Sequence, residues 1–369
     1  MRLLMVTPHL PPYQAANALL PHLLGETFSR RGHQVRFLTF ATGERRADTA
    51  YITRRRGRWR KTRVPQTMEA AQVWWKAGPL IREAEVVHIH SNTWMNQVSA
   101  RLAVRHRRPY LLTHYGTEIW HHDGKEPRFR RMNREAHHVT FYSQALLARA
   151  RELAVPLRAA SVVYPPVAEE FSPLSAEARE EVRQRYVPSG GALLLNVKRL
   201  HPLADQATLL AAFRRVRDAR PDATLLIAGC GDEEGRLRAQ ARELGLDQAV
   251  RFLGLVPNQE VARLQAGADL FVLSSVLEAT PTVALEALAS GTPVISTDNP
   301  GGLELASIFG EDVSVVPRQD PEALARAVLS ALARPRRTLP QTASRLSEGF
   351  RLAGVADRYL ALYREVLAA

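Results

Sequence analysis

The sequence predicts an α/β protein of two domains, each a parallel sheet with helices on both faces. Three observations support this class. Short apolar segments alternate with amphipathic segments along all 369 residues. Strands separated by helices of this length form parallel β-α-β units. The chain is also long enough to bury two cores. Ligands are expected in a cleft faced by both domains, at the carboxyl ends of the strands.

The first domain is expected over residues 1–166. An amphipathic helix is predicted from about Asn17 to Arg31, where Gly32 stops it. Short apolar runs predict strands at 3–7, 35–39, 86–89, 110–113, 139–142 and 161–164.

The second domain, expected over residues 191–345, repeats this alternation. The polar, proline-containing segment 167–190 is expected to be a linker, and residues 346–369 a C-terminal helix. A helix is predicted at 206–217, and strands at 192–197, 224–229, 251–253, 270–273 and 294–296.

Residues 277–297 predict a loop, a helix and a buried strand. Thr280 is a good N-cap, and Pro281 suits the first helical position, where a missing amide has no consequence. Gly291 stands where a left-handed residue would end the helix.

Two glutamates flank this helix start, Glu278 before the helix and Glu286 on it. The free amides of Thr282, Val283 and Ala284 would point out of the helix. Such a terminus carries roughly half a positive charge and suits a phosphate. The carboxylates could accept hydrogen bonds from hydroxyls on either side of that phosphate. The segment therefore predicts a site for a sugar joined to a diphosphate.

The two glutamates resemble the E-x7-E motif of family-4 retaining glycosyltransferases, and residues 287–295 and 301–304 resemble its continuation. The resemblance implies the GT-B fold: two Rossmann-like domains with parallel sheets facing a cleft, and a last helix that crosses back to the first domain. It implies that Glu278 binds donor-sugar hydroxyls and Glu286 the ribose. Glu304 is a weaker candidate for the donor pocket.

The reaction implied by this family is transfer of a hexose from a nucleotide-diphosphate sugar of the UDP, GDP or ADP type, with retention of configuration. No D-x-D metal motif is apparent in the sequence, and no metal or additional cofactor is expected.

The segment 197–202 resembles the family's arginine motif, in which Arg199 would contact the donor diphosphate. The family's lysine five positions later is replaced by Ala204. Lys198 could supply the second charge instead. Alternatively, Arg199 forms a structural ion pair with Asp205.

Two glycines and one strand end complete the expected donor site. Gly229 and Gly231 form a tight turn that borders the nucleotide in the family. The segment 251–256, which ends at Val256, resembles the part whose backbone holds the base.

In the first domain, residues 113–118 follow a strand and resemble the family's histidine loop, which implies that His114 faces the donor sugar and the acceptor hydroxyl. A structural histidine is the alternative. His88 and His90 share a strand face and could suit a metal, and so could the 121–123 segment. No third ligand is identifiable for the pair, and an ordinary polar loop is the favoured interpretation of 121–123.

The first loop departs from the family. Ala15 and Ala16 stand where the family usually has paired glycines, and their methyl groups restrict the backbone near the acceptor. Gln14 and Asn17 are the acceptor-side candidates.

The net charge of +13 lies in the first half of the chain. Residues 1–170 hold 27 Lys and Arg against 13 Asp and Glu, and residues 171–369 hold 23 against 24. Such a cluster with tryptophan suits an anionic membrane surface or an anionic acceptor. A nucleic acid is not expected, and a general preference for arginine is the alternative explanation. The densest cluster comprises Arg54, Arg55, Arg56, Arg58, Trp59 and Arg60.

The composition favours a cytoplasmic protein, peripheral at the inner face of the membrane if its acceptor is lipid-linked. No run reaches the ~18 apolar residues of a membrane span. Cys230, the single cysteine, permits no disulfide within the chain and fits a reducing cytosol.

Three functions remain open. The leading hypothesis is a retaining glycosyltransferase in glycan or glycolipid synthesis, acting on a hydroxyl acceptor that is lipid-linked or anionic. A glycoside hydrolase would use Glu278 and Glu286 as acid and base, but the helix start stabilises the carboxylate and makes Glu278 a poor acid. A noncatalytic protein with this fold would bind an anionic polymer or membrane. The departures at Ala204 and at Ala15–Ala16 support that third alternative.

Overall fold

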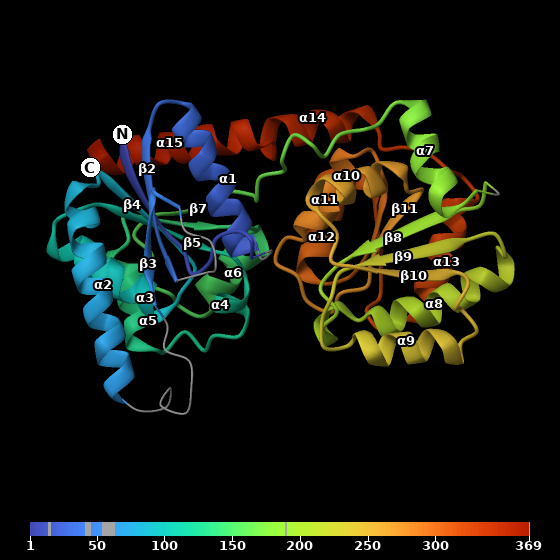
Figure 1. Ribbon diagram of the computed structural model, residues 1–369, viewed down its shortest axis with the longest axis horizontal. Coiled ribbons are helices and arrows are strands. Elements are labelled where there is room, and N and C mark those ends of the chain that lie inside the picture. Colours follow the sequence, from blue (N-terminus) through green and yellow to red (C-terminus); the bar gives the residue numbers. More distant parts are fainter. Residues whose placement is uncertain (14–15, 41–45, 54–62, 189, 369) are drawn as a thin grey trace. The chain divides into compact units, whose positions relative to one another are not determined.

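The computed structural model describes residues 1–13, 16–40, 46–53, 63–188 and 190–368. Contacts divide the chain into two compact units (Figure 1). The N-terminal unit comprises Met1–Pro166 and Leu352–Ala369, and the C-terminal unit comprises Val167–Arg351. In each unit, helices cover both faces of a parallel sheet, which confirms the predicted fold class.

The sheet of the N-terminal unit has seven strands in the order β3-β2-β1-β4-β5-β6-β7. Every residue of β4 and β5 is buried, which is expected when helices cover both faces of a parallel sheet. The register pairs Leu3 of β1 with Val35 of β2 and Val86 of β4. The strands are β1 (Arg2–Val6), β2 (Gln34–Phe40), β3 (Thr49–Ile52), β4 (Val86–His90), β5 (Tyr110–His114), β6 (His138–Phe141) and β7 (Ala160–Val162).

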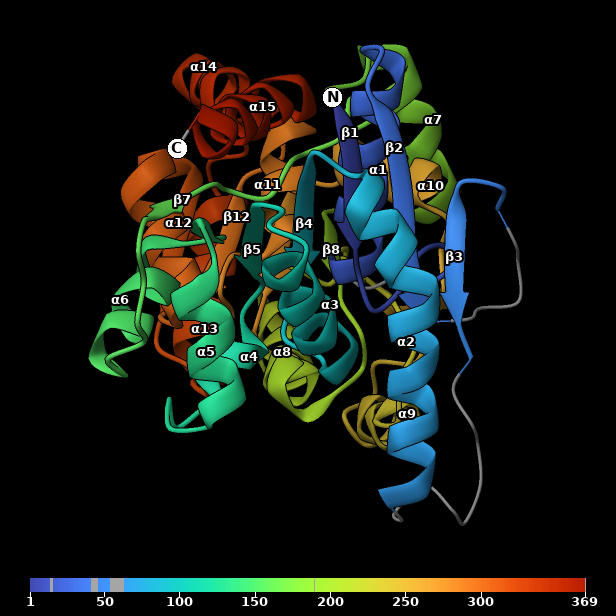
Figure 2. The same ribbon diagram turned by 90° about the vertical axis from the view of Figure 1, so that its left-hand side faces the viewer.

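The last helix, α15, completes the core of the N-terminal unit. Its Tyr359 and Tyr363 are fully buried, and Tyr363 packs edge-on against Phe28 of α1 at 5.7 Å between ring centroids. Figure 2 shows α1 and α15 beside each other in this unit. The unit's helices are α1 (Ala16–Arg30), α2 (Arg63–Glu83), α3 (Trp94–Arg105), α4 (Thr117–Trp120), α5 (Pro127–Glu135), α6 (Gln144–Glu152) and α15 (Leu352–Ala368).

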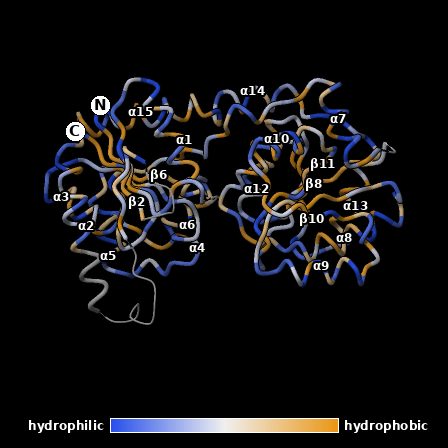
Figure 3. The backbone as a smooth tube through the Cα atoms, viewed as in Figure 1, coloured by the Kyte–Doolittle hydropathy of each residue, from blue (hydrophilic) through white to orange (hydrophobic). Residues whose placement is uncertain are grey.

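The sheet of the C-terminal unit has six strands in the order β10-β9-β8-β11-β12-β13. Hydrophobic residues gather on its strands and on the inner faces of α8 and α13 (Figure 3). The strands are β8 (Leu193–Val197), β9 (Thr224–Ala228), β10 (Val250–Gly254), β11 (Leu270–Leu273), β12 (Val294–Thr297) and β13 (Val313–Val316). The helices are α7 (Ala176–Tyr186), α8 (Gln206–Ala219), α9 (Glu234–Glu243), α10 (Asn258–Gly267), α11 (Thr282–Ala289), α12 (Pro300–Phe309), α13 (Pro321–Leu332) and α14 (Pro340–Gly349), with short turns η2 (Pro202–Ala204) and η3 (Gly310–Asp312).

Residues 167–190, expected as a linker, contain a helix that packs on the C-terminal unit. The Ser175 hydroxyl caps α7, and Val182 and Tyr186 are buried. Arg183 pairs with Asp269 at 2.8 Å. The polar composition of the segment arises because only one narrow face of α7 is buried.

The C-terminal unit also extends beyond residue 345. Helix α14 packs against α11 and α12, and the rings of Phe309 and Phe350 lie 5.3 Å apart. Strands β3 and β13 were not predicted, because each has only four residues at a sheet edge and is partly exposed. Among the described helices, none combines the length and the hydrophobicity needed to cross a bilayer.

A buried hydrogen bond joins α15 to the sheet and can be tested. The Tyr363 hydroxyl lies 2.6 Å from His88 Nδ1. We expect Tyr363→Phe to lower the free energy of unfolding by about 1–3 kcal/mol, because it leaves a buried polar atom unpaired. All five tryptophans lie between residues 59 and 120, so their fluorescence during urea unfolding reports on this unit.

Tyr359→Phe is the matched control. Among the described residues, its hydroxyl makes long contacts only, 3.4 Å to Thr113 and 3.3 Å to Thr140. Equal losses in the two variants would show that the short His88 bond has no special weight.

Candidate functional site

The residues predicted to bind the donor lie within the C-terminal unit, on loops that follow β8, β9 and β11. Lys198 and Arg199 follow β8, Gly229 and Gly231 follow β9, and Glu278 follows β11. Because these strands are parallel neighbours, their carboxyl ends lie at one edge of the sheet.

Gly229 and Gly231 allow two of these loops to touch. A Cβ atom at Gly229 would overlap the Lys198 carbonyl, and one at Gly231 would overlap the Leu200 carbonyl. Gly229 also has φ of 138°, which L side chains rarely adopt. The Leu200 amide donates to the Cys230 carbonyl at 3.1 Å. No larger residue fits this contact without moving the backbone.

Lys198 and Glu278 form an ion pair, with 2.5 Å between Nζ and Oε1. Their side chains are 27% and 12% exposed, so the pair faces solvent while being largely enclosed. Lys198 therefore places its positive charge beside Glu278, the predicted sugar-binding carboxylate. Ala204, which stands at the position of the family's lysine, has no charge to place there.

Arg199 is exposed, and its guanidinium forms no ion pair within the described ranges. The alternative partner, Asp205, instead caps α8 by accepting from the Thr208 amide at 3.3 Å, and it also accepts from the Thr208 hydroxyl at 2.7 Å. The buried Gln206 side chain donates to the Arg199 carbonyl at 3.3 Å and supports this loop. Arg199 is left available for an anion.

The start of α11 differs from the prediction. Thr280 is not the N-cap: the helix begins at Thr282, Pro281 occupies the cap position with ψ of 97°, and no capping side-chain bond occurs there. A residue before proline is held in an extended conformation, which favours a later start. The Ala284 amide is not free either, because it donates to the Pro281 carbonyl at 2.9 Å. Thr282 and Val283 are the two amides that precede the first backbone bond of the helix.

The end of this helix agrees with the prediction. Gly291 has φ of 82° and follows the last turn of α11, and β12 begins at Val294. The side chain of Gln265 donates to the Val283 carbonyl at 2.9 Å and ties α11 to α10.

Glu286 is a half-buried carboxyl with a perturbed acidity. Burial raises its pKa to about 7, the nearby Glu170 adds to this rise, and Lys198 opposes it. No hydrogen bond to its carboxyl group occurs within the described part of the chain. Its carboxylate therefore lacks the donors that would stabilise its charge.

Buried polar side chains that the sequence did not reveal hold the loop before α11. Asn299 Nδ2 donates to the Ser275 carbonyl at 3.1 Å, and Asn299 Oδ1 accepts from the Gly302 amide at 3.0 Å. Ser274 Oγ donates to the Ala204 carbonyl at 2.9 Å. The sequence indicates this role only through the position of Asn299, which directly precedes a proline at the start of a helix.

The remaining donor candidates lie at the border of this site. Val256 is half-buried in the loop after β10. The Gly229 amide donates to the Gly254 carbonyl at 2.8 Å and so joins the loop after β9 to the end of β10. Glu304 is half-buried on α12.

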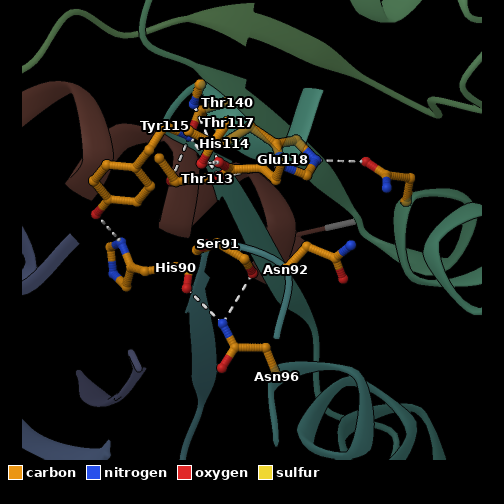
Figure 4. A network of polar contacts seen from close by, with 12 residues as sticks. His90, Ser91, Asn92, Asn96, Thr113, His114, Tyr115, Thr117, Glu118 and Thr140 are labelled. Atoms are coloured by element: carbon orange, nitrogen blue, oxygen red, sulfur yellow. Dashed lines mark hydrogen bonds and ion pairs between the residues drawn. The ribbon is translucent and has the colours of Figure 1, made fainter. Parts of the chain in front are cut away.

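In the N-terminal unit, His114 ends β5 with its ring fully buried (Figure 4). Its Nε2 lies 2.8 Å from Asn133 Oδ1, and its Nδ1 lies 3.7 Å from Glu118 Oε1. Nε2 is thus bonded within the unit, whereas Nδ1 has no hydrogen-bond partner among the described residues. A His and a Glu four positions apart after a strand carry a weak sequence signal, whereas Asn133 carries none.

His88 and His90 are buried side by side, 3.9 Å between ring centroids. Burial lowers the pKa of His88 to about 3, and its two nitrogens bond to Tyr363 and Thr113. His122 Nδ1 accepts from the Gly124 amide at 2.8 Å. No cluster of three or more metal-binding side chains occurs in the described ranges.

The acceptor-side candidates are only partly described. Asn17 lies in the first turn of α1, and its carbonyl accepts from the Thr7 hydroxyl at 2.5 Å. The other candidates fall outside the described residues: Gln14, Arg54, Arg55, Arg56, Arg58, Trp59 and Arg60.

The chain is similar to known glycosyltransferases along most of its length. The model for glycosyl transferases group 1 matches residues 178–349, and the glycosyltransferase family 4 model matches residues 22–171. The chain is 34% identical over 168 residues to D-inositol 3-phosphate glycosyltransferase of Corynebacterium urealyticum, covering 43% of this chain and 39% of that protein. It is 35% identical over 260 residues to glycogen synthase of Mycobacterium tuberculosis, covering 67% and 60%. These matches thus span roughly half the length of the curated relatives.

The solved structure of Anabaena HepE in complex with UDP and glucose superposes with a TM-score of 0.80, at 19% identity and 98% coverage of both chains. At this identity the likeness shows the fold, which is GT-B. With two adjoining family models matched and this fold in common, the chain belongs to the family-4 glycosyltransferases.

Proposed function

We propose that the protein transfers a hexose from a nucleotide-diphosphate sugar to a hydroxyl acceptor, with retention of configuration. The observation that carries this proposal is the pairing of Lys198 with Glu278 beside an unpaired Arg199. Together these side chains bring two cations and a carboxylate to one edge of the sheet in the C-terminal unit, which supports the proposal.

In this proposal, the diphosphate binds to Arg199 and to the free amides of Thr282 and Val283. A charge-assisted hydrogen bond contributes about 1.5–3 kcal/mol. The donor-sugar hydroxyls bind Glu278, whose charge Lys198 partly neutralises. The nucleotide lies against the Gly229–Gly231 turn and Val256, with its ribose hydroxyls on Glu286.

The chemical step breaks the bond between the sugar C1 and the diphosphate oxygen. The acceptor hydroxyl attacks C1 on the same face, and the leaving phosphate takes the acceptor's proton. Arg199 and Lys198 stabilise the charge that grows on the diphosphate. The step thus requires positive charge at the phosphate, which these two residues supply.

The donor is inferred to be of the UDP, GDP or ADP type, with no additional cofactor or metal. HepE was solved with UDP and glucose, and the matched relatives are named for inositol phosphate and glycogen. A hydroxyl acceptor on a sugar or on an inositol phosphate is consistent with these names.

We further infer a cytoplasmic protein that docks at the inner face of the membrane when its acceptor is lipid-linked. Trp74 and Trp75 on α2 are 45% and 78% exposed. The Arg105 guanidinium lies 5.7 Å from the centroid of the Trp74 ring. Exposed tryptophan beside arginine suits the headgroup region of an anionic bilayer.

The glycoside hydrolase alternative can also be tested at Glu286, because a pKa of about 7 suits a general acid. Hydrolysis of a glycoside without any nucleotide, abolished by Glu286→Gln, would support that alternative and contradict transfer.

The role of Arg199 predicts a loss of nucleotide binding. We expect Arg199→Ala to weaken the affinity for the preferred diphosphate among UDP, GDP and ADP by roughly 10- to 100-fold, because a charge-assisted contact is lost. Calorimetric titration measures this change. Arg214→Ala is the control, since Arg214 is exposed on α8 and pairs only with Asp218 among the described residues. Equal affinity in both variants would remove Arg199 from the site.

The raised pKa of Glu286 predicts that nucleotide binding depends on pH. Ribose hydroxyls favour the carboxylate, so binding lowers this pKa and releases a proton. Affinity should therefore increase roughly tenfold as pH rises through about 7, and decrease as pH falls. Glu286→Gln should remove this increase, measured by titration with UDP between about pH 5.5 and 8.5.

The nucleotide's own phosphate titrates in every variant, so the difference between proteins is the readout. Glu322→Gln is the control, because Glu322 is exposed on α13 and pairs with Arg215. A pH dependence that persists unchanged in Glu286→Gln would exclude Glu286 as the ribose ligand.

A further inference from the structure

The loops that precede β5, β6 and β7 in the N-terminal unit form a pocket of about 380 Å³, a size typical of small-molecule sites. These strands are parallel neighbours, so the loops before them lie together at the amino edge of the sheet. Arg107 and Arg108 precede β5, Glu135 and His137 precede β6, and Arg158 precedes β7. These five polar side chains line what is called here the amino-edge pocket.

The amino-edge pocket is separate from the expected reaction site. Ligands of parallel α/β sheets bind at the carboxyl ends of the strands. Strand β5 runs from Tyr110, beside the pocket, to His114 at the opposite edge, and its five residues span about 13 Å. None of the proposed donor and acceptor residues lines the pocket.

Two arginines of the pocket are available for an anion. Arg107 and Arg158 are exposed, and neither guanidinium has a hydrogen-bond or ion-pair partner among the described residues. An exposed arginine elsewhere in the unit, Arg36, pairs with Glu83 at 3.0 Å. The pocket thus gathers cations that the protein itself leaves without a counterion.

Two further donors lie beside them. Arg108 Nη2 donates to the Arg82 carbonyl at 2.5 Å, whereas its buried Nε has no partner among the described residues. His137 Nδ1 accepts from the Tyr110 amide at 3.4 Å. Burial and the charge of Arg158 lower the pKa of His137, so the ring is neutral and carries its proton on Nε2. The ring can therefore donate from Nε2.

The backbone of Arg107 is left-handed, with φ of 52°. Its amide donates to the Val104 carbonyl at 3.0 Å, and the Arg108 amide donates to the Ala103 carbonyl at 2.9 Å. This is a helix end at which glycine or asparagine is usual. Because the left-handed conformation is unfavourable for arginine, the residue destabilises the fold relative to glycine. Its side chain, which lines the pocket, explains its presence there.

The other lining residues restrict the ligand further. Glu135 is half-buried and forms no ion pair among the described residues, so its carboxyl group can accept hydrogen bonds from hydroxyls. Val104 and Leu367 also line the pocket and are 44% and 42% exposed, which provides apolar contact for a carbon chain. An inorganic anion would use only the cations of this pocket.

We propose that the amino-edge pocket binds a phosphate ester that carries hydroxyl groups, with the phosphate on Arg107 and Arg158 and a hydroxyl on Glu135. A guanidinium group can bind two phosphate oxygens at once. A free phosphorylated polyol and the glycerol-phosphate headgroup of a lipid present the same chemistry. The inference goes beyond the proposed transfer function and does not depend on it.

Calorimetric titration of the full chain with glycerol 3-phosphate tests the site. We expect Arg158→Gln to weaken this affinity roughly 10-fold or more, because a charge-assisted contact is lost. Arg149→Gln is the matched control, since Arg149 pairs with Glu152 outside the pocket. Arg199→Ala should also leave the affinity unchanged. Binding that is lost in Arg199→Ala but persists in Arg158→Gln would overturn the proposal, and so would the absence of saturable binding.

The hydroxyl contact is tested by comparing glycerol 3-phosphate with inorganic phosphate. Glu135→Ala removes an acidic group that repels both ligands, but it removes a hydroxyl partner from glycerol 3-phosphate alone. We therefore expect the affinity for glycerol 3-phosphate to fall relative to that for inorganic phosphate. An unchanged ratio of the two affinities would exclude Glu135 as the hydroxyl ligand.

Arg107→Gly separates binding from stability. We expect it to weaken the affinity for glycerol 3-phosphate roughly 10-fold. It should also raise the thermal midpoint of the N-terminal unit by roughly 2 °C, because glycine adopts the left-handed conformation without strain. Tryptophan fluorescence measures this midpoint. Unchanged affinity in the folded variant would remove Arg107 from the site, and a lower midpoint would contradict the strain at this position.

Sedimentation with vesicles distinguishes the two sources of the phosphate ester. The protein is mixed with phosphatidylcholine vesicles that contain phosphatidylglycerol, and with phosphatidylcholine alone. Binding that requires phosphatidylglycerol and is lost in Arg158→Gln supports a lipid headgroup, whereas binding of glycerol 3-phosphate alone supports a free phosphorylated polyol. Failure of both ligands would overturn the proposal. A protein that binds them but transfers no sugar would contradict only the proposed function.

Discussion

The contact between the loops that follow β8 and β9 is the constraint on which the proposed donor site depends. Gly229 and Gly231 let one loop lie directly on the carbonyls of the other. This contact fixes where Lys198 leaves the strand, and so brings its ammonium group to Glu278. A side chain at either glycine would separate the loops and move the cation from the carboxylate. The weak glycine pattern in the sequence thus has a strong steric reason.

The carboxylate charges of Glu278 and Glu286 are stabilised to different extents. Glu278 has a cation beside it, whereas Glu286 is enclosed on α11 without a hydrogen-bond donor among the described residues, and burial raises its pKa. A carboxylate without donors is destabilising in the unbound protein, and hydroxyl groups of a ligand would remove that penalty. In the proposed complex the ribose hydroxyls are these donors, so relief of the penalty at Glu286 contributes to nucleotide binding. Lys198 serves Glu278 directly and lowers the pKa of Glu286 at longer range.

The sequence pattern predicted those features of the fold that depend on residues adjacent in the sequence. Gly291, β12 and the alternation of strands and helices follow from periodicity and turn chemistry, and the structure contains them. Thr280 failed as an N-cap because the geometry before Pro281 moved the helix start. Asn299, Gln206 and Asn133 could not be predicted, because each acts through a contact that the fold creates. Helix α7 was not predicted, because most of its residues are polar and only a narrow face of the helix is buried.

In both units, buried side chains fix the shape of the loops that follow the strands. Loops there must be open to a ligand and yet hold one shape, and neither sheet hydrogen bonds nor a hydrophobic core can fix them. In the C-terminal unit the Asn299 side chain bonds the loop before α11 from beneath. In the N-terminal unit the Glu118 carboxylate accepts from two loop amides, and Asn133 bonds to the His114 ring beside it. A buried carboxylate is a stronger acceptor in this role than a neutral amide, but its burial is costly unless donors bond to it. The amides of Tyr115 and Gly116 supply these hydrogen bonds to Glu118, so the same contacts that fix the loop offset the burial of the carboxylate.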